Sequence, residues 1–318
     1  MRGPWARCWL LTFLAALLAV AFLENLARRR GVQPSWSVGS ESWGMEALDL
    51  EPDGIALLGS SRMLSGVEPE LMSRKTGRRA RQLAINATSM LPILEWLAER
   101  EDFSGIVVAE ITSYLEFRAG GEWRATAERF KHDLGELRRS PARRVESLLS
   151  RFVQTRMACR SPGFHLLTPY RDRHGPGVRR LASLTVEGSR FTRLEFQDGD
   201  ESLEETETGP EKAIPASRAD LDELMNRFAA AARAIQRRGG RVVFLAMPTS
   251  GRVADGEERA FPRKEFWDRL AASTSPESIH FRDHPPLSSF SCPDGEHLSY
   301  EDALRFTRAL AEVLKSAR

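Results

Sequence analysis

The sequence has little cysteine, little lysine and no excess of either charge. Its three cysteines form neither a CxxC pair nor a Cys/His cluster with zinc spacing, which excludes the common zinc modules. Lys and Arg number 46 against 44 Asp and Glu, so the formal net charge is +2 and there is no bulk electrostatic case for nucleic acid. Most basic residues are Arg, which is typical of GC-rich coding and indicates a bacterial source.

The cysteines outside the N-terminal segment are Cys159 and Cys292. They could form a disulfide if the domain faces an oxidising compartment. Pairing needs proximity that sequence does not show, so two unrelated thiols are the simpler interpretation. No pattern in the sequence implies a bound metal or cofactor.

One long hydrophobic run is present, at residues 8–23 (CWLLTFLAALLAVAFL). Its length is close to the lower limit for a membrane-spanning helix, and a signal peptide has the same pattern. No small-x-small cleavage site follows the run, so we expect residues 1–30 to form an uncleaved anchor rather than a cleaved signal. Arginines flank the run on both sides, so the positive-inside rule does not decide its orientation.

Residues 31–52 contain Gly, Ser and Pro with little periodicity, which indicates a linker. From residue 53 onward, short apolar runs alternate with amphipathic stretches. The runs predict buried parallel strands at 54–58, 82–85, 105–111, 241–247 and 278–281, and the stretches predict helices at 89–100, 221–235 and 303–314. This alternation predicts a three-layer α/β/α domain over 53–318 with a parallel, flavodoxin-like sheet.

Residues 114–218 interrupt the alternation and predict an insertion that covers the carboxyl ends of the strands. The insertion contains Arg-rich helical stretches and an acidic run at 198–211. The acidic run is interpreted as a solvated loop, with a cation site as the alternative.

The first motif with chemical potential is Gly59-Ser60-Ser61-Arg62, directly after the first predicted strand. Ligands of open parallel sheets bind beyond the carboxyl ends of the strands, so a Ser at this turn is placed where a nucleophile is needed. A structural turn or a simple anion nest would have the same pattern. Arg62 could bind an anionic substrate, or form an ion pair at the start of a helix.

The second motif is Asp294-Gly295-Glu296-His297, just before the last predicted helix. A serine hydroxyl is a poor nucleophile unless a base lies within hydrogen-bond reach and a third group fixes the tautomer of that base. Asp294 could fold back onto Nδ1 of His297, which leaves Nε2 available to take the serine proton. A surface histidine at a helix start is the alternative interpretation.

Together the two motifs resemble the SGNH/GDSL hydrolase superfamily, in which the nucleophile follows the first strand and a DxxH motif near the C-terminus supplies the acid–base pair. The chain looks closest to membrane-anchored branches with GSS-type turns, such as the DltD-like and alginate-acetylation-type proteins. Aligning the family's Gly-Asp-Ser onto this turn implies Ser61 as the nucleophile, with Ser60 as the alternative. The resemblance covers residues 53–113 and 220–316.

This chain departs from the family's pattern at two further sequence blocks. Where the family has a Gly whose N–H joins the oxyanion hole, this chain has Ala87, and the preceding Asn86 would add a side-chain donor. Where the family has an Asn after the third strand, this chain has Glu110-Ile111-Thr112-Ser113.

The resemblance implies a serine esterase or O-acyltransferase acting on an acylated glycan or polymer of the cell envelope. It implies a single-pass protein of the bacterial cytoplasmic membrane with its domain on the periplasmic side, contacting the membrane through residues 8–23. The missing Asn and the Ala87 replacement favour an alternative, a catalytically degenerate SGNH-like partner of a membrane acyltransferase. A membrane-tethered binding domain without acyl chemistry is the third interpretation.

Overall fold

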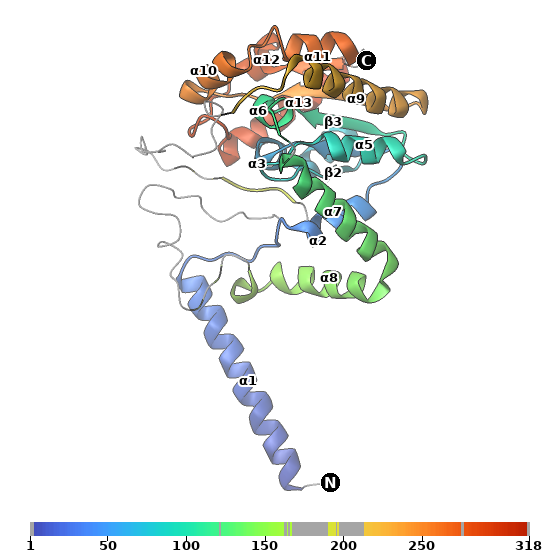
Figure 1. Cartoon of the computed structure of the whole chain (residues 1–318). Coiled ribbons are helices and arrows are strands. Elements are labelled where there is room, and N and C mark those ends of the chain that lie inside the picture. Colours follow the sequence, from blue (N-terminus) through green and yellow to red (C-terminus); the bar gives the residue numbers. More distant parts are fainter. Residues whose placement is uncertain are drawn as a thin grey trace.

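The sheet at the centre of the domain is entirely parallel. The computed structural model describes residues 3–120, 122–161, 164, 166, 190–194, 196, 213–274 and 277–316. Five strands pair in the order β2-β1-β3-β4-β5, a common order of doubly wound sheets and the one found in flavodoxin (Figure 1). The strands are β1 (Ile55–Leu58), β2 (Ala80–Gln82), β3 (Ile106–Glu110), β4 (Arg241–Ala246) and β5 (Glu277–His280).

Helices cover both faces of the sheet, as expected for strands that are apolar on both sides. One face packs against α2 (Ser40–Leu48), α5 (Leu91–Glu99), α7 (Glu122–Arg139), α9 (Arg218–Arg237) and α11 (Trp267–Thr274). The other face packs against α3 (Ser61–Gly66), α4 (Pro69–Thr76), α12 (Pro285–Ser288) and α13 (Tyr300–Ser316). The predicted three-layer α/β/α fold is therefore confirmed.

Several shorter or peripheral elements complete the described chain. They are α1 (Pro4–Arg29), α6 (Ser113–Glu116), α8 (Pro141–Gln154), the 3-10 turn η1 (Ala158–Arg160), α10 (Gly251–Ala260) and the 3-10 turn η4 (Phe281–Asp283).

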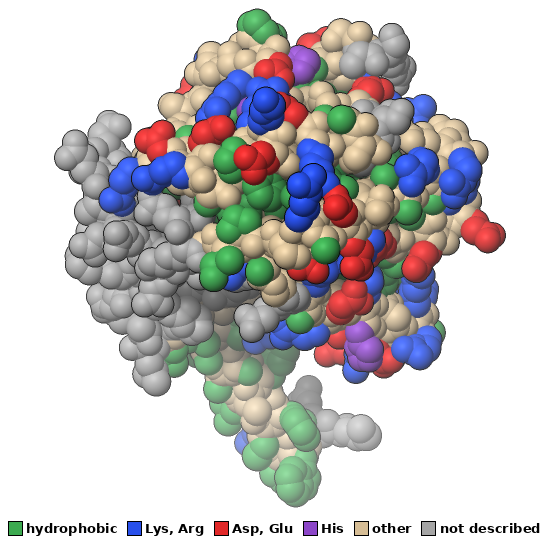
Figure 2. All heavy atoms as spheres, turned by 45° about the horizontal axis from the view of Figure 1, so that its top comes forward, with side chains coloured by type: hydrophobic (Ala, Val, Ile, Leu, Met, Phe, Trp, Pro, Cys, Tyr) green, Lys and Arg blue, Asp and Glu red, His purple; other side chains and the backbone are tan. Residues whose placement is uncertain are grey.

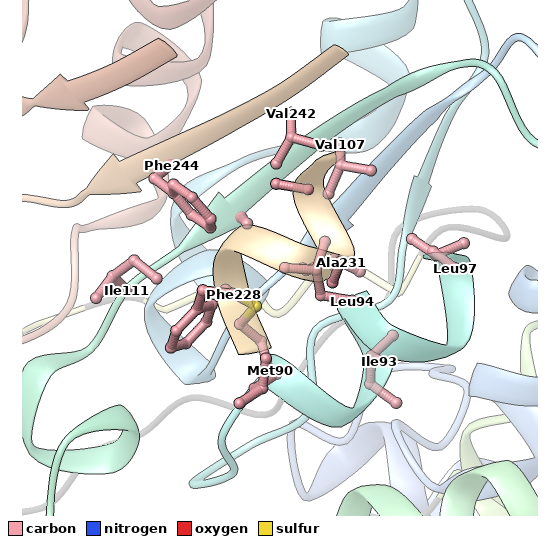
Figure 3. Packing of buried hydrophobic residues seen from close by; sticks show 14 of the residues in the cluster. Met90, Ile93, Leu94, Leu97, Val107, Ile111, Phe228, Ala231, Val242 and Phe244 are labelled. Carbon is pink, nitrogen blue, oxygen red and sulfur yellow. The ribbon is translucent and has the colours of Figure 1, made fainter. Parts of the chain in front are cut away.

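The larger core cluster shows how strand residues alternate between the faces. Val107 of β3 and Phe244 of β4 point toward α5 and α9, where they meet Leu94 and Phe228 (Figure 3). Their neighbours Val108 and Leu245 belong to the cluster on the opposite face. Burial of both faces explains why these strands have continuous apolar sequences.

The second strand lies slightly earlier in the sequence than predicted. β2 is Ala80–Gln82, whereas the apolar run predicted residues 82–85. The chain nevertheless continues along β1, because Leu83 N–H donates to the Leu57 carbonyl at 2.8 Å and Ile85 N–H to the Gly59 carbonyl at 2.9 Å. Residue 86 therefore leaves the sheet beside the end of β1.

The structure differs from the expected linker at residues 31–52. This segment contains α2, whose Trp43 is fully buried and donates from Nε1 to the Leu83 carbonyl at 2.8 Å. Val32 and Trp36 are buried as well. The helix is too short for a clear apolar period, which is why composition indicated a connection rather than a core element.

The described part of residues 114–218 is mainly helical. α7 packs in the core cluster against α2 and α5, so this part of the insertion lies against the helices on one side of the sheet. Further along, Arg190 is fully buried, and its guanidinium donates to the carbonyls of Gln82 and Ala84, both at 2.9 Å. The acidic run at 198–211 lies outside the described residues.

α1 projects away from the domain (Figure 1). It spans 26 residues, and an 18-residue window of it has a mean hydropathy of 2.1, with none of the residues in that window buried. Figure 2 shows mostly hydrophobic side chains along it, whereas the domain face drawn there mixes acidic and basic side chains. By length and composition, this helix is able to cross a membrane.

We predict that Trp43→Ala lowers the free energy of unfolding by about 3–5 kcal/mol, because it opens a cavity and removes the bond to the Leu83 carbonyl. Urea unfolding of the full chain in detergent, followed by circular dichroism, measures this. Glu41→Ala on the exposed side of the same helix is the control, with a change within about 0.5 kcal/mol. Equal, small effects of both variants would mean that α2 is not part of the cooperative core.

Candidate active site

The turn after β1 is built around Gly59. Its φ is +152°, and a Cβ at this position would lie 2.5 Å from Glu110 Oε2 and 2.8 Å from Met63 Cβ. Only glycine combines that conformation with so close an approach. The turn therefore passes directly against the end of β3 before α3 begins.

The two serines of the turn have different surroundings. Ser60 is buried as the N-cap of α3; its N–H and hydroxyl both donate to Glu110 Oε2, at 2.8 and 3.0 Å. Ser61, the first residue of α3, is partly exposed. Of the two candidates for nucleophile, the structure turns Ser60 inward and Ser61 toward the histidine described next.

Ser61, His297 and Asp294 form a continuous hydrogen-bonded chain. Ser61 Oγ lies 2.8 Å from His297 Nε2, and His297 Nδ1 lies 2.8 Å from Asp294 Oδ2. The other carboxylate oxygen, Asp294 Oδ1, accepts from the backbone N–H groups of His297 at 2.7 Å and Glu296 at 3.0 Å. Ser61 is thus brought, from 236 positions away in the sequence, to the Asp294–His297 pair, and the three residues have the arrangement of a serine nucleophile, its base and the group that orients the base.

The environment of Asp294 keeps its carboxyl ionised. Burial alone would raise its pKa, but the hydrogen bond and charge of His297, with the backbone N–H bonds, lower the pKa of Asp294 below its ordinary value. An ionised Asp294 accepts a hydrogen bond from the Nδ1–H group of His297. The Nε2 lone pair then faces the hydroxyl of Ser61.

The loop after β4 supports the Asp–His turn. Ser250 N–H donates to the Gly295 carbonyl at 3.0 Å, and Ser250 Oγ accepts from the Cys292 N–H at 2.9 Å. Gly295 has φ +83°, and a Cβ there would lie 2.7 Å from Val253 Cγ2. Residue Ser250 therefore lies against the turn that carries Asp294 and His297. Cys292 and Cys159 are both free thiols.

Glu110 accepts the hydrogen bonds that fix the serine turn. It is buried at the end of β3, and besides Ser60 it accepts from Thr112 Oγ1 at 2.5 Å. Burial raises the pKa of Glu110 above its ordinary value, while the charge of Arg62 and the N–H of Ser60 act against that rise. The sequence shows a charged residue inside the apolar run 106–111, a signal that could have identified Glu110 as a positioning residue.

A second buried glutamate, Glu116, holds the turn after β2. It accepts from Ser89 Oγ at 2.6 Å and from the Met90 N–H at 2.7 Å. Burial raises the pKa of Glu116 to about 7. Nothing in its sequence position, within a predicted insertion, pointed to this role.

The two candidate oxyanion residues lie in this turn. Asn86 and Ala87 are both exposed, one step beyond the point where Ile85 pairs with Gly59. Ala87 has φ +50° and is the sole non-glycine residue with positive φ within the described ranges. That left-handed conformation is the one glycine adopts most readily.

Arg62 has the second of its two predicted roles. Its side chain is 3% exposed, with Nη2 2.8 Å from Glu257 Oε1 and the guanidinium over the Tyr114 ring. Tyr114 in turn donates to Glu296 Oε2 at 3.2 Å. Arg62 therefore ties α3 to α10 and stands beneath the site rather than facing a substrate.

In a scan against protein-family models no family matches this chain, and a search of curated proteins finds no match either. Within the described residues, no group of three His, Cys, Asp or Glu side chains is arranged to hold a metal ion. The chemical interpretation of the site therefore depends on the geometry of its own residues.

We predict that Gly59→Ala destabilises the fold by about 1–3 kcal/mol through its clash with Glu110, and that it displaces Ser61. Gly77→Ala is a matched control, because Gly77 also has positive φ but a Cβ there meets nothing within 4 Å. The control should cost about 1–2 kcal/mol for the backbone conformation alone and leave the reactivity of Ser61 unchanged. Loss of serine reactivity in both variants, or in neither, would contradict the role given to Gly59.

We predict that Glu116→Gln removes a pH dependence of stability. Because the folded-state pKa of Glu116 is about 7, the native protein keeps this proton after the unfolded chain has released it, so stability falls as pH rises from about 4.5 to about 7. Glutamine can bond both Ser89 and Met90 without a charge, and should be more stable than the parent at pH 8 by a difference on the order of 3 kcal/mol, but not at pH 4.

Denaturant unfolding at pH 4, 6 and 8 measures this, with exposed Glu301→Gln as the control. Parallel pH profiles for the parent and Glu116→Gln would show that the buried carboxyl does not titrate as described.

Proposed function

We propose that this protein is a membrane-anchored, SGNH-like serine esterase or O-acyltransferase that acts on an acylated glycan or polymer of the cell envelope. The observation that carries the proposal is the chain Ser61 Oγ–His297 Nε2 and His297 Nδ1–Asp294 Oδ2, each step 2.8 Å. A serine hydroxyl in this arrangement is activated for attack on a carbonyl carbon.

In the proposed reaction, Ser61 Oγ attacks the ester carbonyl while its proton passes to His297 Nε2. Asp294 holds the imidazole and stabilises its charged form. His297 then returns the proton to the departing alcohol oxygen as the carbonyl reforms, leaving an acyl group on Ser61. Water or an acceptor hydroxyl, deprotonated in turn by His297, then attacks the acyl carbon. The bond to Ser61 Oγ breaks, His297 returns the proton to Oγ, and the acyl group leaves as an acid or a new ester.

The oxyanion of the intermediate would be held by backbone N–H groups. Ser61 is the first residue of α3, so its N–H has no acceptor within the helix. Ala87 is the second donor proposed, because its φ of +50° gives it the backbone conformation that favours glycine, the family's residue at this point. Donors fixed in advance toward developing charge stabilise such transition states strongly.

The substrate class and location rest on the family resemblance together with α1. The geometry of the serine and Asp–His motifs supports the resemblance, and the sheet order agrees with it. An N-terminal helix able to cross a membrane supports a single-pass protein. We propose the bacterial cytoplasmic membrane, with the domain on the periplasmic side where envelope polymers are acylated.

One departure from the family favours a second candidate function, a non-catalytic partner that presents an acyl chain or polymer to a membrane acyltransferase. The family's Asn after the third strand is absent, and Glu110 in that block turns its carboxylate toward Ser60 and Thr112. A site without that Asn would have one polar group fewer to hold substrate.

A fluorophosphonate probe distinguishes the two candidates. We expect the full chain in detergent to be labelled at Ser61, with at least a hundredfold slower labelling in Ser61→Ala and His297→Ala, since general-base assistance contributes about 10²–10⁴-fold. Asp294→Asn should also slow labelling, because it disturbs the tautomer of His297. Ser60→Ala is the matched control and should keep most of its reactivity.

Circular dichroism should show each variant to be folded. Failure of the folded parent to react with the probe would reject the enzyme and leave the binding partner. Loss of labelling in Ser60→Ala with retention in Ser61→Ala would move the nucleophile to the neighbouring serine.

A further inference from the structure

α8 exposes its apolar side and buries its polar side. The exposed side chains lie at the spacing of one helical stripe, and half or more of each is exposed: Val145 (56%), Leu148 (50%), Leu149 (60%) and Phe152 (56%). A surface helix of a globular domain normally has the reverse arrangement.

The side of α8 that packs against the domain is made of polar residues. Ser147 is 3% exposed, and Arg151 stacks on the Trp36 ring with its guanidinium carbon 4.9 Å from the ring centroid. Gln154 Oε1 accepts from the Ser37 N–H at 3.3 Å. These contacts fix the rotation of α8, so the apolar stripe cannot turn inward to join the core without breaking them.

The C-terminal end of α8 leads directly to the base of α1. In η1, which follows α8, the N–H groups of Ala158 and Cys159 donate to the Glu24 carboxylate at 3.1 and 3.0 Å. Ala27 and Val32 pack with Ala158 in a small buried cluster. Glu24 comes directly after the apolar run 8–23, so η1 lies at the level where the hydrophobic part of α1 ends.

α1 and α8 lie at the same end of the domain. Figure 1 shows α8 lying crosswise to α1, at the side of the domain from which α1 projects. Leu166, 51% exposed, lies at this level too, since its carbonyl accepts from Arg30 Nη1 at 3.0 Å. A membrane crossed by α1 would have its surface at the height of α8.

The charges at this level are predominantly positive. Glu146 is the single acidic residue of α8. Exposed arginines follow the apolar run of α1 and flank the stripe of α8; they are Arg28, Arg29, Arg30, Arg143, Arg156 and Arg160. Basic side chains around an exposed apolar stripe are characteristic of helices that lie in the plane of a membrane interface containing anionic lipid.

We propose that α8 is an interfacial helix that docks on the same membrane that α1 crosses, with its apolar stripe among the upper acyl chains and the arginines at the lipid phosphates. This inference is independent of the chemistry proposed for Ser61. It does require that α1 spans a membrane.

The test uses the full chain in nanodiscs of phosphatidylcholine and phosphatidylglycerol that carry a doxyl spin label high on one acyl chain. Cys8 and Cys159 are changed to Ser, and the environment-sensitive fluorophore NBD is attached at Leu149→Cys. Ala272→Cys on α11, exposed at the end of the domain away from α1, is the matched control (Figure 1). NBD at the native Cys8, with Cys159→Ser alone, reports on the anchor.

We expect the probe at position 149 to shift its emission to the blue and to lose most of its intensity to the spin-labelled lipid, while the probe at 272 does neither. Adding Leu148→Asp and Phe152→Asp should restore the emission of the probe at 149 to that of an aqueous probe. Both changes are on exposed positions and leave the packed side of α8 intact.

Docking of α8 would be overturned if NBD at positions 149 and 272 had equal emission and equal quenching by aqueous iodide. Quenching of NBD at Cys8 by the spin-labelled lipid in the same nanodiscs would show that α1 is nevertheless inserted. Shielding of position 149 in native membranes but not in nanodiscs would show that a protein covers the stripe, and would overturn the lipid proposal as well.

Discussion

The geometry of the candidate site depends on one buried contact, between the carboxylate of Glu110 at the end of β3 and the N–H and hydroxyl of Ser60 in the turn after β1. Parallel strands bring these two ends to the same edge of the sheet. A carboxylate taken out of water needs such donors, and the turn needs an acceptor for groups that β1 no longer pairs. The contact provides donors for the carboxylate and an acceptor for the turn. The next residue, Ser61, then lies on the outer side of the turn, facing His297.

Glu116 serves the neighbouring turn in the same way, through Ser89 and Met90. Both turns at this edge are thus held by carboxylates that come from the segment at the end of β3. Burial raises the pKa of each glutamate. The candidate site is therefore supported by ionisable groups that do not hydrogen-bond Ser61. Its geometry and the stability of the fold depend on the same two buried carboxyl groups.

The parts of the site that the sequence predicted are those carried by local signals. Ser61 closely follows an apolar run, and Asp294 and His297 are three residues apart just before the last predicted helix, so each could be recognised within a few letters. The choice between Ser60 and Ser61 could not, because it depends on which hydroxyl meets a residue fifty positions later, Glu110. A tertiary contact, rather than a sequence pattern, distinguishes the cap residue Ser60 from the candidate nucleophile Ser61.

The fold was predicted for a similar reason, since buried parallel strands have apolar runs that need no knowledge of their partners. Short segments were harder: α2 was expected as a linker because its nine residues are too few to show a period, although Trp43 is fully buried. α8 presents the opposite difficulty. Its apolar stripe has the sequence pattern of a core helix, and only its contacts through Ser147 and Gln154 show that the stripe faces outward.

The close packing between the end of α1 and the domain has a consequence for the position of Ser61 relative to a membrane. Val32 and Trp36 are buried and Glu24 is bonded to η1, so the described chain from the helix end to α2 offers no free tether. On a membrane crossed by α1, Ser61 would stand at one fixed height and search by lateral diffusion, in two dimensions. With the proposed function, Ser61 would act only on groups that reach this plane and would not reach identical groups farther from the membrane.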